Sequence, residues 1–515
     1  MNKKRTSGIL AHITSLPSPY GIGDIGPASY HFIDFLAAAE QSCWQFLPTG
    51  PTNPFFDNSP YMSTSSFAGS FLLISPDLLY EAGLISRSSL DHHPSFSPYW
   101  TDYQAAGDYK KLLLQEAYSC FKQQSTPEFT QFKETTIWLR DYAIFMTAKL
   151  LFDDRGWFAW PGDLASRNKD ALQSIIDTAL DTFNYFCFEQ FEFYRQWKQL
   201  REYAEAKSIQ LFGDLPIYVG HDSADVWAKQ DIFILDRTTF QPTSVSGVPP
   251  DYFSKTGQRW GNPLYDWHNK APSVRSNILD WWCNRLAHLF KQVDMVRIDH
   301  FRAFESYWSI PAEEETAING KWLKGPGKPF FDQIFDKLGH LNIVAEDLGI
   351  ITKDVEILRD ALGFPGMKVL QFGFDFDVNN SFLPQNFDTT ECIVYTGTHD
   401  NDTSVGWFLS DKLNDQQRTL IRSYANKDLH DPQGIHQDMM FLAQSSISKL
   451  CIFPLQDVLG FGNDCKMNSP GVPTGNWRWR CAEEFLSPQI IQQLQDSTRR
   501  FNRARDGSTE SEDLI

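Results

Sequence analysis

The sequence predicts an α/β protein whose strands alternate with helices, and two observations suggest a (β/α)8 barrel. Short β-rich runs recur along the 515 residues, and helical stretches separate several of them. The runs number eight, as the strands of such a barrel do. They cover residues 8–13, 43–48, 211–219, 294–300, 342–349, 367–374, 392–400 and 451–460. Because their spacing is uneven, periodicity alone leaves a doubly wound sheet as an alternative.

The widest gap between runs, about residues 72–208, reads as a mainly helical insertion. Aromatic residues recur there at helical spacing. They include Phe183, Cys187, Phe191 and Tyr194, and also Trp138, Tyr142 and Phe145. We interpret these stripes as core packing rather than as a ligand cradle. The polar, acidic tail, about residues 505–515, is expected to be disordered.

Composition excludes several classes of partner. The chain has 64 acidic against 46 basic residues and a formal charge of −18, so nucleic acid and anionic membranes would be repelled. No apolar run reaches the roughly 18–20 residues that a membrane span needs. The eight cysteines are scattered without a C-x-x-C pair, which indicates reduced, buried thiols. We therefore expect a cytoplasmic protein.

Three β-rich runs are each followed by an acid and a turn. Asp299 follows "VRI", Glu346 follows "IVA", and Asp400 lies in "VYTGTHDND" beside His399. In a barrel the carboxyl ends of the strands meet at one mouth, so these acids would converge. A single Asp at a strand end is more often a cap or a loop carboxylate, but three repeats favour a site. A divalent metal could use the same acids, although no H-x-x-x-H cluster accompanies them.

Two such acids suit the cleavage of a glycosidic bond, in which one attacks as a carboxylate and the other donates a proton. Arg297 lies two residues before Asp299, so on a strand both side chains share a face, and the guanidinium would hold the aspartate ionised. Glu346 has no basic neighbour in its own run. The hypothesis is that Asp299 is the nucleophile and Glu346 the acid.

The motifs resemble those of the amylomaltase or disproportionating-enzyme family, the 4-α-glucanotransferases of the α-amylase clan. They run in the family's order from about residue 8 to 480. The sequences that carry the resemblance are "TSLPSPYGIGDIG", "SPYMSTSSFAG", "GDLPIYVGHDSADVW", "SGVPPDYFSKTGQRWGNPLY", "RIDHFRAFESYWSIP", "VAEDLG", "GFPGMKVLQFGFD", "VYTGTHDNDT" and "KMNSPGVPTGNWRWR". The resemblance implies one catalytic (β/α)8 barrel over residues 1–515, with helical insertions and no separate C-terminal β-sandwich.

The resemblance also implies an activity. Members of this family cut an α-1,4-glucan, hold the fragment covalently and pass it to the 4-hydroxyl of a glucose or glucan acceptor, with retention and with no metal or organic cofactor. By motif match, Asp299 resembles the nucleophile and Glu346 the general acid/base. Asp400 resembles a third acid, which with His399 would hold hydroxyls of the sugar being cleaved. Oligomeric state is not indicated.

Further residues are assigned to substrate through the same resemblance. The stretch "DYFSKTGQRWGNP", within about residues 244–267, is Gly-rich and aromatic, as surface loops are. By composition alone its rings would be packing residues; the resemblance implies a lid in which Asp251, Tyr252, Phe253 and Trp260 face ligand. Arg297, Tyr61 and Asp214 match positions that line the cleft, although Asp214 alone could equally be a structural loop acid.

The chain departs from the family pattern at four positions: Ser70 replaces Asn, Ala303 replaces Gly, Gln385 replaces His and Lys466 replaces Arg. Lys466 matters most, because an ammonium cannot reproduce a bidentate guanidinium contact. Two other functions compete with glucanotransfer, namely a hydrolase of the same clan and a silent glucan-binding protein. A phosphorylase fits less well, because no pyridoxal-phosphate signature is found.

Overall fold

The computed structural model describes residues 4–124, 126–250, 254–425 and 434–505, and it is built around a parallel eight-stranded sheet. The strands follow one another round the sheet in chain order, and every pairing is parallel. Between β9 and β10 the Ala345 N–H donates to the Pro365 carbonyl at 2.9 Å, so the sheet closes nearly into a barrel. The strands are β1 (Thr6–Leu10), β2 (Cys43–Gln45), β3 (Gln210–Leu215), β6 (Met295–Ile298), β9 (Ile343–Ala345), β10 (Gly366–Val369), β11 (Cys392–Tyr395) and β12 (Leu450–Pro454).

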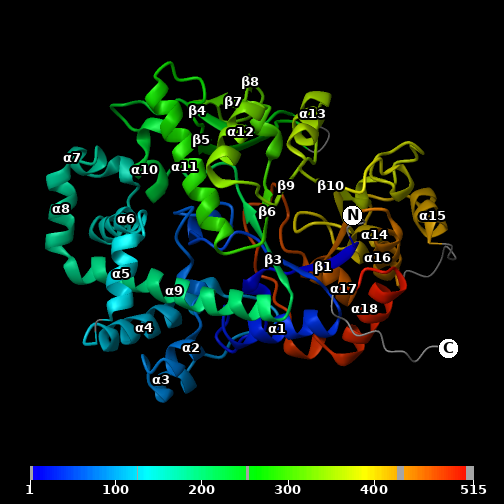
Figure 1. Ribbon diagram of the computed structural model, residues 1–515, viewed down its shortest axis with the longest axis horizontal. Helices are drawn as coiled ribbons and strands as arrows, with labels where there is room; N and C mark the ends of the chain where they lie inside the picture. The colour runs from blue at the N-terminus through cyan, green and yellow to red at the C-terminus, as the bar shows by residue number, and fades with distance from the viewer. Residues whose placement is uncertain (1–3, 125, 251–253, 426–433, 506–515) are drawn as a thin grey trace.

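Each of the eight predicted β-rich runs overlaps one of these strands, which confirms the barrel and removes the doubly wound alternative. The strands are short and almost wholly buried, as expected where helices cover a parallel sheet. The main helices round it are α1 (Pro27–Ala38), α9 (Leu180–Ala206), α11 (Pro272–Phe290), α12 (Gly327–Leu338), α13 (Lys353–Leu362), α14 (Ser404–Leu409), α15 (Asp415–Tyr424), α16 (Ile435–Ser445), α17 (Leu455–Leu459) and α18 (Pro488–Arg500). Figure 1 shows the barrel at the centre of the molecule.

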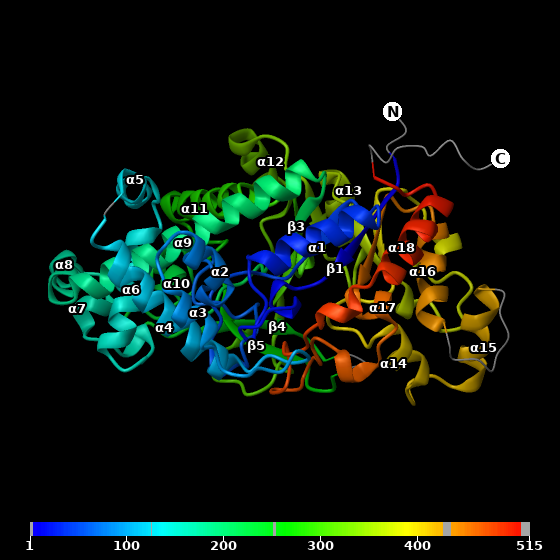
Figure 2. The same cartoon turned by 90° about the horizontal axis from the view of Figure 1, so that it is seen from below.

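The segment between β2 and β3 is helical and explains the uneven spacing of the runs. It contains α2 (Pro76–Glu81), α3 (Arg87–Asp91), α4 (Tyr103–Phe121), α5 (Pro127–Thr135), α6 (Leu139–Leu151), α7 (Gly162–Ala165), α8 (Lys169–Thr178) and then α9. In both Figure 1 and Figure 2, α4–α8 lie on the side of the molecule away from α14–α16. The aromatic stripes of α6 and α9 join the main hydrophobic core, as the sequence predicts.

A second sheet, antiparallel and four-stranded, was not predicted. Its strands are β4 (Ser244–Val248), β5 (Gln258–Pro263), β7 (Ser306–Pro311) and β8 (Lys321–Lys324), in the order β5-β4-β7-β8. The expected loop over residues 244–267 is therefore partly a β-hairpin. Its glycines misled the prediction: at Gly247, beside a register shift, a Cβ would lie 2.2 Å from the Gln258 carbonyl oxygen, so glycine here permits close strand pairing.

The chain after β12 alternates helices with irregular segments as far as it is described. Residues 455–505 hold α17, α18 and short 3-10 turns, with no strand and hence no β-sandwich. The expected disordered tail lies, from residue 506 onward, outside the described residues. Among the helices of the described segments, none has the length and apolarity to cross a membrane. All eight cysteines are free thiols, and six of them are buried.

Candidate active site

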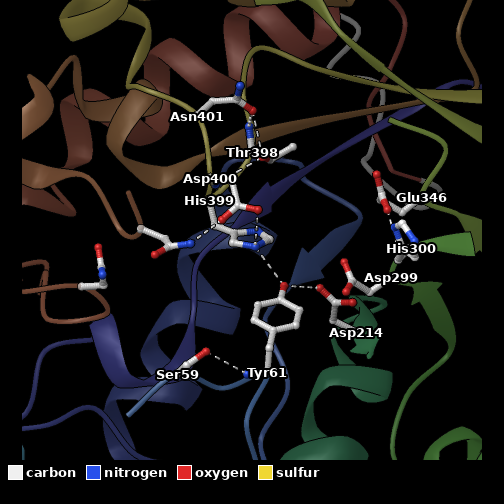
Figure 3. A network of polar contacts seen from close by, with 12 residues as sticks. Ser59, Tyr61, Asp214, Asp299, His300, Glu346, Thr398, His399, Asp400 and Asn401 are labelled. Carbon is white, nitrogen blue, oxygen red and sulfur yellow. Dashed lines mark hydrogen bonds and ion pairs between the residues drawn. The ribbon is translucent and has the colours of Figure 1, made fainter. Parts of the chain in front are cut away.

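The side chains singled out in the sequence meet at the carboxyl ends of the barrel strands. Asp214 on β3 lies opposite Arg297 on β6 in the sheet register. Asp299 follows β6, Glu346 follows β9, and His399 and Asp400 follow β11. Figure 3 shows Asp214, Asp299 and Glu346 facing His399 and Asp400 across the end of the barrel, with Tyr61 beneath His399. The convergence inferred from three separate runs is therefore present in the structure.

Four residues form what we call the floor: Asp214, Arg297 and His399, which are buried, and Tyr61, which is partly buried. The Tyr61 hydroxyl donates to Asp214 Oδ2 at 2.8 Å and lies 2.9 Å from His399 Nε2. Since a phenol has one proton to give, Tyr61 accepts the second bond, and His399 carries its hydrogen on Nε2. Burial lowers the pKa of His399, so its ring is neutral at neutral pH. Arg297 Nη1 completes the floor by donating to Asp214 Oδ2 at 2.6 Å.

Asp214 differs from its sequence assignment as a cleft-lining residue. Its side chain has 0% of its surface exposed. It lies under Tyr61 and Arg297, and its remaining oxygen, Oδ1, has no hydrogen-bond partner among the described residues. Arg297 is similarly covered, with 6% of its side chain exposed. Both residues therefore hold other groups in place instead of presenting a surface of their own.

Asp299 stands above the floor and is partly open. Arg297 Nη2 donates to Asp299 Oδ1 at 2.9 Å, as R-x-D on a strand predicts, and 30% of the Asp299 side chain is exposed. Burial raises the pKa of Asp299 to about 8, and the carboxylates of Asp214 and Glu346 add to the rise against the opposing Arg297. The sequence predicted the guanidinium's effect but not the burial and the neighbouring acids, which together outweigh it. A proton is therefore held within the acid cluster near neutral pH.

Glu346 is held by the backbone. Its Oε2 accepts from the His300 N–H at 2.7 Å and its Oε1 from the Leu348 N–H at 3.0 Å. Burial raises the pKa of Glu346, while Arg297 and these two amides oppose the rise. No cation bonds this carboxyl directly in the part of the chain that the structure describes. The amides fix its direction, and they favour its charged form less than burial disfavours it.

Asp400 is the most open of the acids and is held by a residue that sequence reasoning missed. Asn468 Nδ2 donates to Asp400 Oδ1 at 2.7 Å, and the Asn468 N–H donates to the His399 carbonyl at 3.1 Å. The Asp400 side chain is 44% exposed. Asn468 lies in the "KMNSPG" motif, which gave no indication of its partner because the two residues are 68 positions apart.

Lys466, the notable departure from the family pattern, anchors the same segment. Its Nζ donates to Asp402 Oδ1 at 3.0 Å, and Lys412 bonds the other oxygen of Asp402. Burial acts to raise the pKa of Asp402, but the hydrogen bonds from Lys412 and Lys466 outweigh it and lower the pKa. The ion pair joins the chain after β11 to the chain that carries Asn468. Of the other departures, Ala303 and Ser70 are buried and Gln385 donates to the Tyr424 hydroxyl at 2.9 Å.

Trp260 reaches the site through His300. Its ring lies 4.8 Å from the His300 ring, centroid to centroid, at 88°. The other residues assigned to the lid, Asp251, Tyr252 and Phe253, lie outside the described residues. Two small cavities lie next to the floor. One of about 20 Å3 is lined in part by His399, and the other, of about 70 Å3, in part by Tyr61 and Asp214.

Comparison with known proteins shows which family the chain resembles in sequence and in structure. A family model described as 4-alpha-glucanotransferase matches residues 11–486. A 4-alpha-glucanotransferase of Synechocystis is 47% identical over 98% of this chain and 99% of its own. The chloroplastic/amyloplastic enzyme of Solanum tuberosum is 41% identical over 93% of this chain and 82% of its own. The amylomaltase of Streptococcus agalactiae, solved in complex with acarbose, is 37% identical, with a TM-score of 0.92 over 98% of this chain and 100% of its own.

Proposed function

The chain belongs to the 4-alpha-glucanotransferase family, and we propose that Asp299, Glu346 and Asp400 carry out its reaction by a retaining double displacement. The glucanotransferase activity itself follows from full-length relatives at 47% and 41% identity. The observation that supports the residue roles is the meeting of the three acids at the strand ends, where Arg297 bonds Asp299.

In the first step, a carboxylate oxygen of Asp299 attacks the anomeric carbon of the donor sugar. The bond from that carbon to the glycosidic oxygen breaks, and the oxygen takes a proton from Glu346. The donor fragment is then an ester of Asp299. In the second step, Glu346 removes the proton from the 4-hydroxyl of the acceptor, whose oxygen attacks the same carbon and releases Asp299. Two inversions give net retention.

The division of labour rests on the contacts of the two acids. Asp299 has a direct bond from Arg297 at 2.9 Å and an open side chain, so charge is stabilised there. Glu346 has amide donors only, and burial disfavours its charged form. Burial raises the pKa of both acids, and we assign the proton that the coupled pair retains to Glu346, because only Asp299 has a direct bond from a cation.

Asp400 and His399 bind the sugar and take no part in proton transfer. His399 belongs to the floor and Asp400 is open beside it, and both positions suit hydrogen bonds to ring hydroxyls. Such bonds lower the barrier when they tighten only as the ring flattens toward the oxocarbenium-like transition state. Asn468 keeps Asp400 in place for this purpose.

The donor that we propose is an α-1,4-glucan, namely a maltooligosaccharide, starch or glycogen, and the acceptor is glucose or another glucan. The acarbose complex of the streptococcal amylomaltase supports a sugar ligand of this kind. Trp260, with Asp251, Tyr252 and Phe253, would cover the bound sugars. A transferase needs such a cover, since water competes with the acceptor for the Asp299 ester. The free thiols support a reducing, cytosolic location.

Incubation of the purified protein with maltotriose tests the proposal. The protein is first dialysed against a chelator, and both product lengths and total reducing ends are followed. Transfer gives glucose and a ladder of longer maltooligosaccharides at nearly constant reducing ends. A rise in reducing ends without longer products would identify a hydrolase instead. The Asp299→Asn variant should give neither change, and an active variant would remove the role proposed for Asp299.

A further inference from the structure

His300, the residue after Asp299, has a backbone conformation that few residues adopt. Its φ is 50° and its ψ is 47°, in the left-handed region. Residues other than glycine enter this region uncommonly, although histidine, asparagine and aspartate do so more than most. Strain of this kind persists where surrounding contacts hold it, and it gathers at functional sites. The contacts of His300 therefore indicate what the conformation is for.

The backbone of His300 belongs to a clamp that joins the ends of β6 and β9. Glu346 N–H donates to the Ile298 carbonyl at 3.0 Å, and Phe301 N–H donates to the Glu346 carbonyl at 3.1 Å. Between them, the His300 N–H donates to the Glu346 carboxylate at 2.7 Å. The chain turns out of β6 at His300 while these bonds stay in place. The direction of the Glu346 carboxyl thus depends on the turn at His300.

The ring of His300 makes a different contact. It packs edge-to-face on Trp260 of β5, in the antiparallel sheet outside the barrel, with centroids 4.8 Å apart. Burial lowers the pKa of His300 to about 3, so the ring is a neutral aromatic edge. Figure 3 shows His300 between Asp299 and Glu346. One residue therefore contacts both the acid and the sheet that carries Trp260.

We propose that His300 is a positioning residue that couples Glu346 to the acceptor-side aromatic: its amide aims the carboxyl, and its ring supports Trp260. The inference rests on the function proposed above. A general acid faces the glycosidic oxygen, so the leaving sugar, and later the acceptor, lies on the acid's side of the cluster. Trp260 stands on that side through its contact with His300.

The position places two demands on its side chain, and substitutions can separate them. Asparagine tolerates the left-handed conformation but has no ring, whereas phenylalanine has a ring but disfavours that conformation. His300→Asn should therefore loosen Trp260 and spare the clamp. His300→Phe should keep an aromatic contact and disturb the clamp. Histidine meets both demands.

The experiment measures transfer from maltotriose to labelled glucose, with steady-state constants for glucose and the fraction of donor lost to water. For His300→Asn we expect the KM for glucose to rise about tenfold, more than kcat falls, with a larger hydrolysed fraction. For His300→Phe we expect kcat to fall about 100-fold, because a misplacement near 1 Å has that effect. Equal kinetics in the two variants, or a change in kcat alone for His300→Asn, would overturn the proposal.

If His300→Phe does not fold, a double-mutant cycle still tests the proposal. Trp260→Ala combined with His300→Asn should raise the glucose KM little beyond either single change, since both remove one contact. If the two changes instead multiplied in their effect on the glucose KM, the proposed coupling of His300 to Trp260 would be wrong. Ser208→Val is the matched control, because Ser208 has φ 57° in the turn before β3. It should lower the melting temperature without altering the KM for glucose. Transfer by Asp299→Asn would refute the proposed function itself, which these outcomes do not touch.

Discussion

The two central acids of the site are held in opposite ways. Asp299 is held by a side chain: Arg297, on the same strand, spans Asp214 and Asp299 with its two terminal nitrogens. Glu346 is held by the main chain, through the amides of His300 and Leu348. A guanidinium stabilises a negative charge and an amide pair fixes a direction. The difference suits a nucleophile that must be charged and an acid that must release and regain one proton.

The largest expected effects come from removing each acid, and an activated donor separates them. Asp299→Asn should lose about 10⁴-fold in transfer with both maltotriose and a maltosyl fluoride, since neither reacts without the nucleophile. Glu346→Gln should lose about 10³-fold with maltotriose but far less in fluoride release, because fluoride leaves without a proton. Steady-state rates with both donors measure this. The reverse pattern would exchange the two roles.

A smaller effect should follow from altering Arg297, the cation that bonds Asp299 but not Glu346. We expect Arg297→Lys to lower kcat about 100-fold, because one ammonium cannot make both contacts in the geometry of the guanidinium fork. The fluoride donor should show the same loss, since the damage falls on Asp299. Arg87→Lys, at an exposed pair with Asp91, is the control and should change kcat less than twofold. A normal rate for Arg297→Lys would contradict the floor's role.

The pH dependence of stability sharpens the comparison further. The pKa of Asp299 rises from 3.8 in the unfolded chain to about 8 in the folded one, so the acid cluster to which Asp299 is coupled binds a proton more tightly when folded. The contribution of this bound proton to the free energy of unfolding therefore falls as the pH rises from about 4 to about 8. Asp299→Asn escapes this loss, so its melting temperature should exceed that of the wild type by about 1–3 °C at pH 8 and by less at pH 5. Calorimetry at both pH values checks the sign, and a larger gain at pH 5 would contradict it.

The smallest effect is expected at Lys466. Arginine there can still pair with Asp402, so Lys466→Arg should alter kcat and KM for maltotriose by less than about twofold. Lys466→Met leaves Asp402 to Lys412 and loosens the segment that carries Asn468, so kcat should fall about tenfold. If Lys466→Met were as active as Lys466→Arg, the anchoring role would be lost.

The sequence predicts the side-chain half of this site far better than the main-chain half. Each barrel strand showed as a local β-rich run, and R-x-D on a strand placed Arg297 beside Asp299. The clamp on Glu346 depends on the left-handed turn at His300, which no local pattern signals. Asn468 and Asp400 meet only through the fold. The antiparallel sheet was not predicted for a related reason. Its glycines and prolines are typical of a loop, and the pairing of β4 with β7 that makes it a sheet is seen only in the fold.

The most direct test of the account is to identify the residue that carries the sugar. The Glu346→Gln variant is treated with a maltosyl fluoride that lacks the terminal 4-hydroxyl and so cannot serve as its own acceptor. The ester that forms is then slow to break down, and the protein is digested and its peptides are weighed. We predict one maltosyl-type unit on the peptide that contains Asp299, absent when Asp299 is also changed to Asn. A sugar on Asp400, or turnover of the donor with no ester at any residue, would contradict the account.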